Sequence, residues 1–197
     1  MARRQDGSPG PRAAMTASAV ALMRERGVAA TSFADVLAHS GAPRGSIYHH
    51  FPGGKAQLIE EATRSASDRL TDKIQGILDS GDTVTAVRSL VDLWRRELET
   101  TDYAAGCPIV AAALGTEASA RDIAGISFAR WSEMIGARLV GDGVDPARAA
   151  TLATMLLSAL EGGLILAHAQ RSAAPLDAVV GELELLCRAA GAVTPTE

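Results

Sequence analysis

The chain of 197 residues has only two cysteines, and it contains neither a long apolar run nor a familiar catalytic motif. The cysteines, Cys107 and Cys187, are far apart, and neither belongs to a Cys-x-x-Cys pair or has a histidine at metal-ligand spacing. We therefore expect two reduced thiols packed as small core residues, with no metal site and no cofactor. The sequence has no HExxH, no nucleophile elbow and no glycine-rich phosphate loop before a helix, so an enzyme is the least favoured class.

Membrane and β-sheet signals are also missing. No apolar run approaches the roughly 18 residues of a membrane span, and the polar residues 1–12 lack the apolar core of a signal peptide. We therefore expect a cytoplasmic protein without membrane contact. Alternating strand patterns of convincing length are absent, whereas helical periodicity recurs along the chain. With 47% hydrophobic residues the chain can bury a core, and it is predicted to be all-α.

Charge is distributed unevenly. The net charge of −4 by itself argues against a nucleic-acid binder. Residues 1–58, however, carry seven Lys/Arg and three acidic residues, a balance of +4, while the remainder carries −8. Three of the four histidines also lie in this basic part. A basic N-terminal part on an acidic remainder indicates that only the N-terminal part meets phosphates.

The N-terminal part has the layout of a helix-turn-helix. An apolar stripe from Met15 predicts a long helix that Gly27 ends. Ser32 is a good N-cap for a short second helix, which residues 40–42 break. Pro43 suits the opening of a third helix, because its fixed φ is compatible with the first helical position. The order of long helix, short helix, glycine-containing turn and short helix predicts DNA binding.

The third helix has an inward and an outward face. Ile47 and Phe51 lie one turn apart and are expected in the small core, since the three-helix unit has little else to bury. An arginine beside them can fork onto guanine or phosphate, and a glycine lets the backbone approach the groove wall. The residues left facing outward are Arg44, Gly45, Ser46, Tyr48 and His49.

The segment TSFADVLAHSGAPRGSIYHHFPGGKAQLI, which begins at Thr31, resembles the N-terminal domain of the TetR family of bacterial repressors. The resemblance implies a DNA-binding domain over residues 12–57 and a ligand-binding and dimerisation domain over residues 58–191. It implies a homodimer on a palindromic operator in double-stranded DNA. Its loop before Lys55 is one residue longer than the family's usual spacing. The DNA-contacting residues it implies, with those of the outward face, are Thr31, Ser32, Arg44, Gly45, Ser46, Tyr48, His49 and Lys55.

The remainder of the chain reads as a helical bundle. Apolar stripes predict helices from about Lys55 to Ser80, through Val84 to Leu98, from Ile109 to Leu114, through Ile123 to Ile135, from Pro146 to about Ala169 and from Pro175 to about Ala190. The last two either pair with a second copy as a four-helix interface or pack only within one chain. Leu183 and Leu186 are expected on the paired stripe.

The segment from Gly106 to Ile109 and the Gly-Gly loop before Lys55 resemble the LmrA/YxaF-like branch. That resemblance implies a small hydrophobic or aromatic effector. Bulky residues of the central helices either line its pocket or fill a core. Glu161, in an apolar helix, either meets a polar ligand group or reaches solvent or a partner chain. The candidate effector-binding residues are Trp94, Leu98, Cys107, Phe128, Trp131, Met134 and Met155.

Three classes of function follow from these features. The first is a repressor that an effector releases from its operator. The second is a constitutive or protein-partnered DNA-binding regulator with a filled core. The third is a helical enzyme with dispersed catalytic residues. The basic helix-turn-helix favours the first two over the third, and a cavity in the C-terminal part distinguishes the first from the second.

Overall fold

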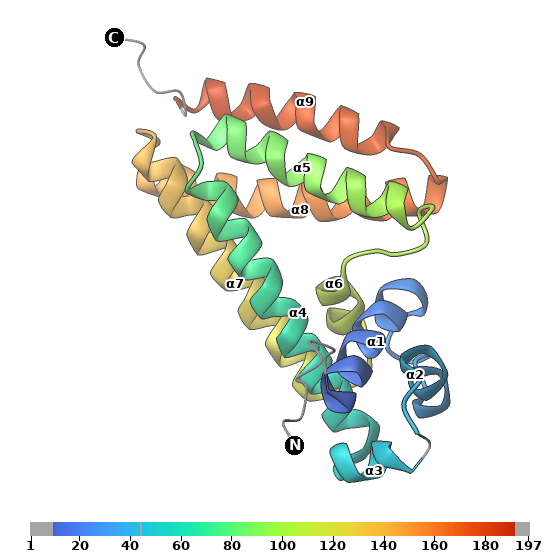
Figure 1. Ribbon diagram of the computed structural model, residues 1–197. Helices are drawn as coiled ribbons and strands as arrows, with labels where there is room; N and C mark the ends of the chain where they lie inside the picture. The colour runs from blue at the N-terminus through green and yellow to red at the C-terminus, as the bar shows by residue number, and fades with distance from the viewer. Residues whose placement is uncertain (1–9, 44, 192–197) are drawn as a thin grey trace, which may run out of the picture.

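The computed structural model describes residues 10–43 and 45–191, and over these residues the chain forms helices and no strand. Helices α1 to α3 form a small domain at one end of the molecule, and α5, α8 and α9 lie together at the other end (Figure 1). The long helices α4 and α7 run side by side between the two ends, where α6 also lies. The helices are α1 (Pro11–Arg26), α2 (Phe33–Ser40), α3 (Ser46–His50), α4 (Gly54–Leu78), α5 (Thr83–Thr100), α6 (Pro108–Ala113), α7 (Ala118–Gly141), α8 (Pro146–Gln170) and α9 (Ala174–Ala189).

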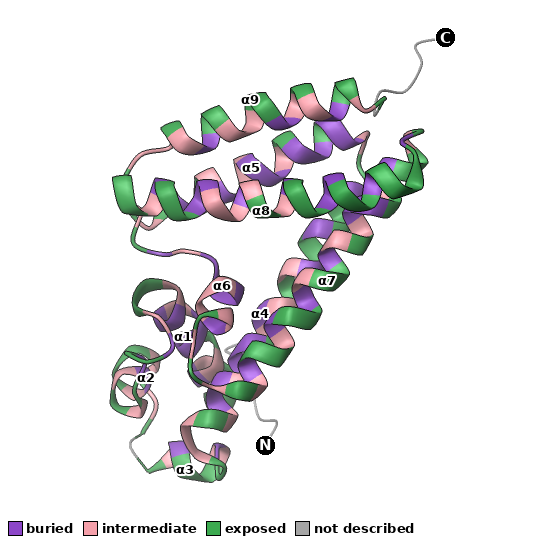
Figure 2. Cartoon of the chain, turned by 180° about the vertical axis from the view of Figure 1, so that it is seen from behind, coloured by how far each residue is buried: buried purple, intermediate pink, exposed green. Residues whose placement is uncertain are grey.

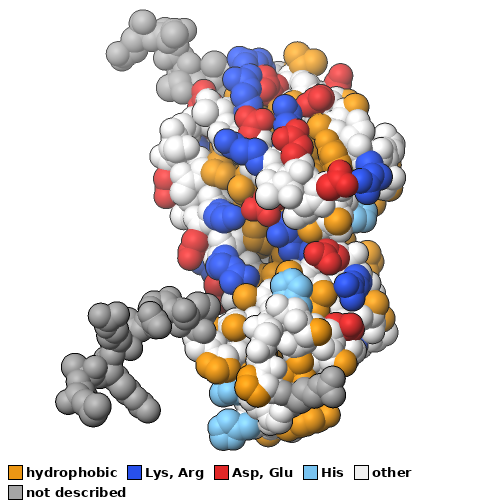
Figure 3. All heavy atoms as spheres, turned by 45° about the vertical axis from the view of Figure 1, so that its right-hand side comes forward, with side chains coloured by type: hydrophobic (Ala, Val, Ile, Leu, Met, Phe, Trp, Pro, Cys, Tyr) orange, Lys and Arg blue, Asp and Glu red, His pale blue; other side chains and the backbone are white. Residues whose placement is uncertain are grey.

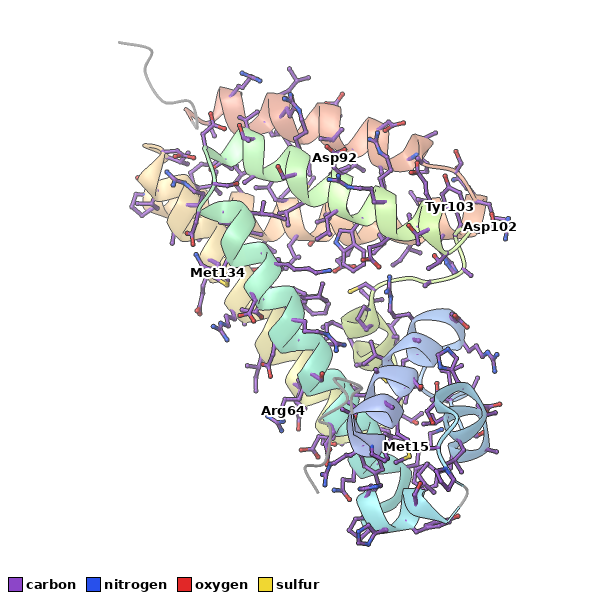
Figure 4. The ribbon with its side chains drawn as sticks, viewed as in Figure 1. Met15, Arg64, Asp92, Asp102, Tyr103 and Met134 are labelled. Carbon is purple, nitrogen blue, oxygen red and sulfur yellow. The ribbon has the colours of Figure 1, made fainter. Side chains whose placement is uncertain are left out.

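Caps define the first two helices as the sequence predicts. Gly27 follows α1 with φ +78°, a conformation that glycine adopts without strain. The Ser32 hydroxyl accepts from the backbone N–H of Asp35, and the Asp35 carboxylate accepts from the Ser32 backbone, which completes a capping box at α2. Met15 points into the interior of this domain, where Ile47 and Phe51 are fully buried (Figure 4). The predicted core of the three-helix unit is thus confirmed.

Helix α3 is shorter than expected. It begins at Ser46 and not at Pro43, because Pro43 takes part in the preceding turn. The Pro43 carbonyl accepts both the backbone N–H of Ser46 at 2.9 Å and its hydroxyl at 2.7 Å. Gly41 ends α2 in the left-handed region with φ +67°. Pro43, which was expected to open the third helix, therefore precedes it.

Polar contacts hold α4 against α7. The indole Nε1 of Trp131 donates to the Thr71 hydroxyl at 2.8 Å, and both side chains are buried. The hydroxyls of Ser67 and Ser127 form a second hydrogen bond across the pair at 2.7 Å. A buried indole without a partner would cost about 1–3 kcal/mol, so these contacts fix the register of two otherwise apolar faces.

The C-terminal helices are joined by one carboxylate and by close packing. Asp142, which follows α7, accepts from the backbone N–H and hydroxyl of Thr83 at the start of α5, and Arg138 pairs with it. Asp145 caps α8 as predicted. At Gly163 a Cβ would lie 3.0 Å from the Val179 side chain, so α8 and α9 approach closely there.

Two expectations about the chain need correction. The expected domain boundary at residues 57/58 falls inside α4, whose start packs on α1 and whose continuation packs on α7. Helix α8 is long and apolar enough to cross a membrane by length and composition, contrary to the expectation that no segment approaches this. Core helices of soluble proteins pass the same test, and α8 packs along α7 and α9 (Figure 2).

Candidate nucleic-acid interface and ligand pocket

The outer face of α3 is the exposed part of the helix-turn-helix. Tyr48 is 69% exposed, and its neighbour His49 is also exposed, whereas Ile47 and Phe51 are fully buried. Helix α3 accordingly shows both exposed and buried stretches in Figure 2. The Tyr48 ring packs edge-on against Phe33 of α2, with centroids 5.6 Å apart. This contact orients the phenol and leaves its hydroxyl free to donate to a phosphate.

The start of α3 combines open space with a fixed turn. Gly45 is exposed, and a Cβ at this position would meet nothing within 4 Å, so the backbone is accessible to a groove wall. The Ser46 hydroxyl is already bonded to the Pro43 carbonyl, so in this state it stabilises the turn. Arg44, the predicted guanine reader, lies outside the described residues.

Thr31 must be corrected as a predicted DNA contact. It is 1% exposed, and its hydroxyl donates to the Gly27 carbonyl at 2.9 Å, so it closes the turn between α1 and α2. Ser32 is exposed, but its hydroxyl is committed to the capping box. A cap needs its side-chain oxygen for the free N–H groups of the first turn. Both residues therefore position α2, and Tyr48 and His49 present the free side chains.

Lys55 lies in the first turn of α4, next to the loop that the extra glycine lengthens. Gly54 has φ +75°, which accommodates the additional residue. The Lys55 ammonium donates to the Ala29 carbonyl at 3.0 Å, so it reaches back over the loop between α1 and α2. Its side chain stays partly exposed on the same domain as α3.

The arginines of α1 are less available than the charge count suggests. Arg12 pairs with Glu61, Arg24 with Glu97 and Arg26 with Asp35. On the face in Figure 3, histidines lie at the lower tip of the molecule and also higher up, whereas the Lys and Arg side chains lie above that tip. Lys55 differs from these three arginines, because its ammonium bonds a neutral carbonyl and not a carboxylate.

The C-terminal domain contains a hollow of about 500 Å³ between α6, α7 and α8, which we call the effector hollow. This volume is within the roughly 300–1,000 Å³ typical of small-molecule pockets. Its walls are mostly apolar with a few hydroxyls and one carboxylate. The lining residues are Val110, Ala113, Leu114, Phe128, Ala129, Ser132, Thr154, Leu157, Ser158, Glu161 and Ile165.

Phe128 is the one predicted effector residue that lines this hollow. Trp131 packs edge-on behind it, with ring centroids 5.5 Å apart, and is a core residue bonded to Thr71. Leu98 is fully buried, and Trp94 borders a separate, smaller hollow of about 100 Å³. The prediction is therefore wrong for Leu98 and Trp131, which are packed as core, whereas Trp94 lines the smaller hollow and its role stays a prediction.

Met134 and Met155 also require correction. Met134 follows Ser132 by two positions, which turns it about 200° around α7 from the hollow. It lies on the outer side of the α4–α7 pair (Figure 4). Met155 is 50% exposed on α8 and is not part of the lining. Helical periodicity separates inward from outward faces, but it does not say which of several neighbours a partly exposed face meets.

Glu161 is the charged group of the effector hollow. Its Oε2 is buried and has no hydrogen-bond partner among the described residues. Burial raises the pKa of Glu161 to about 7, and a hydrogen bond with the Cys107 thiol opposes that shift. Burial, followed by the neighbouring carboxylate of Glu161, raises the pKa of Cys107 well above its ordinary value. Cys107 thus contacts Glu161, which lines the hollow, but does not line the hollow itself.

The residues of α8 that line the hollow were not predicted, although their spacing in the sequence places them on one helix face. Thr154, Leu157, Ser158, Glu161 and Ile165 follow the spacing i, i+3, i+4, i+7 and i+11, which places them on one face of α8. Because this face mixes hydroxyls and a carboxylate with apolar groups, it did not stand out as a hydrophobic stripe. The predicted effector-binding residues were mainly large aromatic and methionine side chains instead.

Reciprocal hydrogen bonds connect α1 to the segment that leads into α6. The Gly106 N–H donates to the Arg24 carbonyl at 3.0 Å, and the Arg24 guanidinium Nε donates back to the Gly106 carbonyl at 2.9 Å. Arg24 is on α1, and Gly106 directly precedes Cys107, the N-cap of α6. These bonds therefore tie the start of α6 to the helix that packs on α2 and α3.

This geometry defines a DNA-binding regulator of the helix-turn-helix class with a helical C-terminal domain. Residues 16–62 match the family model for bacterial regulatory proteins of the tetR family. Residues 83–182 match the model for the C-terminal domain of LmrA/YxaF-like transcriptional regulators. The chain therefore belongs to the TetR family, in its LmrA/YxaF-like branch.

Relatives extend over most of the chain. It is 41% identical over 185 residues to the HTH-type transcriptional regulator Rv0196 of Mycobacterium tuberculosis (strain H37Rv), covering 90% of this chain and 94% of that protein. It is 28% identical over 174 residues to the HTH-type transcriptional regulator YxaF of Bacillus subtilis (strain 168), covering 86% and 91%. A TetR transcriptional regulator from Chloroflexus aurantiacus has a similar structure, with a TM-score of 0.77, 27% identity and coverage of 90% and 94%. These proteins are transcriptional regulators and not enzymes, in agreement with the sequence-based expectation.

Proposed function

We propose that this chain is a dimeric cytoplasmic repressor that binds a palindromic operator and is released from it by a small, mainly hydrophobic effector. The DNA half of the proposal rests on the α2–turn–α3 unit, whose Tyr48 and His49 are exposed, and on the partly exposed Lys55 of the same domain. The effector half rests chiefly on one observation, the hollow of about 500 Å³ between α6, α7 and α8. A constitutive or protein-partnered regulator would not need such a hollow.

An unpartnered apolar face supports the dimer. Met155, Gly162 and Leu166 lie on one side of α8, and Met155 and Leu166 are each 50% exposed. Nothing lies within 4 Å of a Cβ built at Gly162, so a second helix has room to approach closely. Leu185 of α9 is 61% exposed. Two copies of α8 and α9 meeting on these faces would form a four-helix interface around a two-fold axis.

One residue of the expected interface belongs elsewhere. Leu183 is 3% exposed and contributes to the core between α5, α8 and α9. Leu186 is partly buried against that core. The terminal stripe of α9 is therefore covered within the chain by α5, and the dimer face lies toward Leu185 and the exposed side of α8.

Effector release requires a link between the hollow and α3. Val110 and Ala113 of α6 form one wall of the hollow, and α6 is tied to α1 through Gly106 and Arg24. An effector that displaces α6 would therefore tilt α1 and change the separation of the two recognition helices. These helices must sit about 34–36 Å apart to enter successive major grooves. Tenfold release needs about 1.4 kcal/mol of differential effector affinity between the free and DNA-bound states.

Selection of bound duplexes from a random pool tests the DNA half directly. We expect enrichment of a palindrome with half-sites about one helical turn apart. A library of apolar compounds, screened for release of the selected duplex, then tests the effector half. Recovery of a palindrome with no releasing compound would favour the constitutive or protein-partnered alternative. Failure to enrich any sequence would contradict specific operator binding.

A further inference from the structure

The carboxylate of Glu161 is placed unlike the other well-buried carboxylate of the C-terminal domain. The Asp142 side chain is 4% exposed and is satisfied by the backbone N–H and hydroxyl of Thr83 and by Arg138. The Oε2 of Glu161 is also buried, yet it has no hydrogen-bond partner among the described residues. Asp142 therefore has a structural role, whereas the Oε2 atom of Glu161 keeps a bonding capacity that the described residues do not use.

The surroundings of Glu161 define what would satisfy it. No other charged residue is among the residues that line the effector hollow, and its remaining polar groups are the hydroxyls of Ser132, Thr154 and Ser158. A lone carboxylate in an apolar wall costs several kcal/mol when ionised and unpaired. A ligand that carries a positive charge removes that cost, because it supplies both the opposite charge and the missing donor.

The rest of the hollow favours an apolar body on the ligand. Phe128, Leu157 and Ile165 supply aromatic and branched walls, and the Phe128 ring is held edge-on by Trp131. The volume of about 500 Å³ accommodates a fused two-ring compound with a short side chain. Apolar walls and one anionic group together select an amphipathic cation.

We propose that the effector hollow binds protonated amines attached to a flat apolar group, and that the Glu161 carboxylate pairs with the ammonium. The regulatory consequence rests on the proposed function above, whereas the binding itself does not. Glu161 also neighbours Cys107, the N-cap of α6, so an ammonium at this carboxylate would compete with the contact between Glu161 and the start of α6. The ammonium would thus bind next to the start of α6, the helix that contacts α1.

Calorimetric titration with two matched probes tests this assignment. The probes are 1-naphthylmethylamine and its uncharged counterpart 1-naphthylmethanol, added to the full-length protein at pH 8, where Glu161 is ionised. The wild-type protein should bind the amine at least about tenfold more tightly than the alcohol. Glu161→Gln, which keeps the shape and removes the charge, should lose this preference and bind both probes alike. Glu133→Gln, the same change on an exposed part of α7, should keep it.

Each outcome decides the assignment. Equal affinity of Glu161→Gln and wild type for the amine, no preference in the wild type, or no binding of either probe would overturn it. Thermal unfolding of both variants checks that lost binding is not lost folding. Release of the selected operator is measured separately. An amine that binds through Glu161 without releasing DNA would leave this assignment intact and contradict the effector half of the proposed function.

Discussion

Replacement of Glu161 by glutamine should change the pH dependence of stability in a predictable way. Burial raises the pKa of this carboxyl from its ordinary 4.5 to about 7 in the folded chain. The folded state therefore holds a proton that the unfolded state releases between these two values. Because the folded state binds more protons, the unfolding free energy falls as pH rises through this window, and above about pH 7 the loss is complete. The shift of about 2.5 pH units corresponds to roughly 3 kcal/mol, taken as an upper estimate.

Urea unfolding of the ligand-free protein at pH 5 and pH 8, at one protein concentration, measures this effect. The wild type should lose more stability between the two values than Glu161→Gln, by up to about 3 kcal/mol, and Glu133→Gln should follow the wild type. The other shifted groups titrate outside this window. The pKa values of Asp35, Glu61 and Asp82 are lowered, those of Arg12 and Cys107 are raised above ordinary values that already lie higher, and that of Cys187 is raised to about 11. Parallel pH profiles for wild type and Glu161→Gln would refute the reasoning that this carboxyl is buried and unsatisfied.

Three further substitutions separate binding, capping and assembly. Tyr48→Phe removes a phenol hydroxyl that no residue in the described part of the chain bonds; it should weaken all duplexes alike by about 1–2 kcal/mol in an anisotropy titration, without changing the unfolding midpoint. A loss confined to one base position would contradict the phosphate role. Ser32→Ala removes the α2 cap and should lower the unfolding free energy by about 0.5–2 kcal/mol in urea, while an unchanged midpoint would show that the capping box contributes nothing. Leu166→Asp, on the exposed face of α8, should give a folded monomer in sedimentation, whereas Leu183→Asp should unfold the chain; a stable dimer of Leu166→Asp would exclude that face as the interface.

The helix-turn-helix was predictable because its signals are local. Ser32 and Asp35 make a capping box from adjacent residues, and Ile47 and Phe51 have nowhere else to pack in so small a unit. The exception is Pro43. A proline fits both the first turn of a helix and the loop that precedes the helix. Hydrogen bonds from Ser46 to the Pro43 carbonyl place Pro43 in the loop, and these bonds cannot be predicted from the sequence.

The pocket was less predictable because it depends on which helices meet. Trp131 and Leu98 have the size and polarity expected of ligand walls, but they pack behind Phe128 or in the core. The decisive residue, Glu161, was open to three interpretations from its sequence context alone. Only the arrangement of α6, α7 and α8 shows that Glu161 lines the hollow and that its Oε2 has no hydrogen-bond partner among the described residues.

Leu183 illustrates the same limit at the interface. A terminal apolar stripe without a later element to cover it predicts an intermolecular contact. Helix α5, which comes earlier in the chain, covers this stripe instead, and ion pairs between Arg88 and Glu184 and between Arg95 and Asp177 align the two helices. The order of helices in the sequence does not show which earlier helix packs against the last one.

The salt dependence of operator binding tests the central claim most directly. A duplex from the selection and a scrambled duplex of equal length are titrated with wild-type protein by fluorescence anisotropy over a range of salt concentrations. The claim predicts tight, saturable binding of the selected duplex and a linear fall of log K with log salt, with a slope of about −0.9 for each phosphate contacted. The scrambled duplex should bind far more weakly at every salt concentration. Equal affinity for both duplexes, or an affinity that does not change with salt, would contradict the account of this chain as an operator-binding regulator.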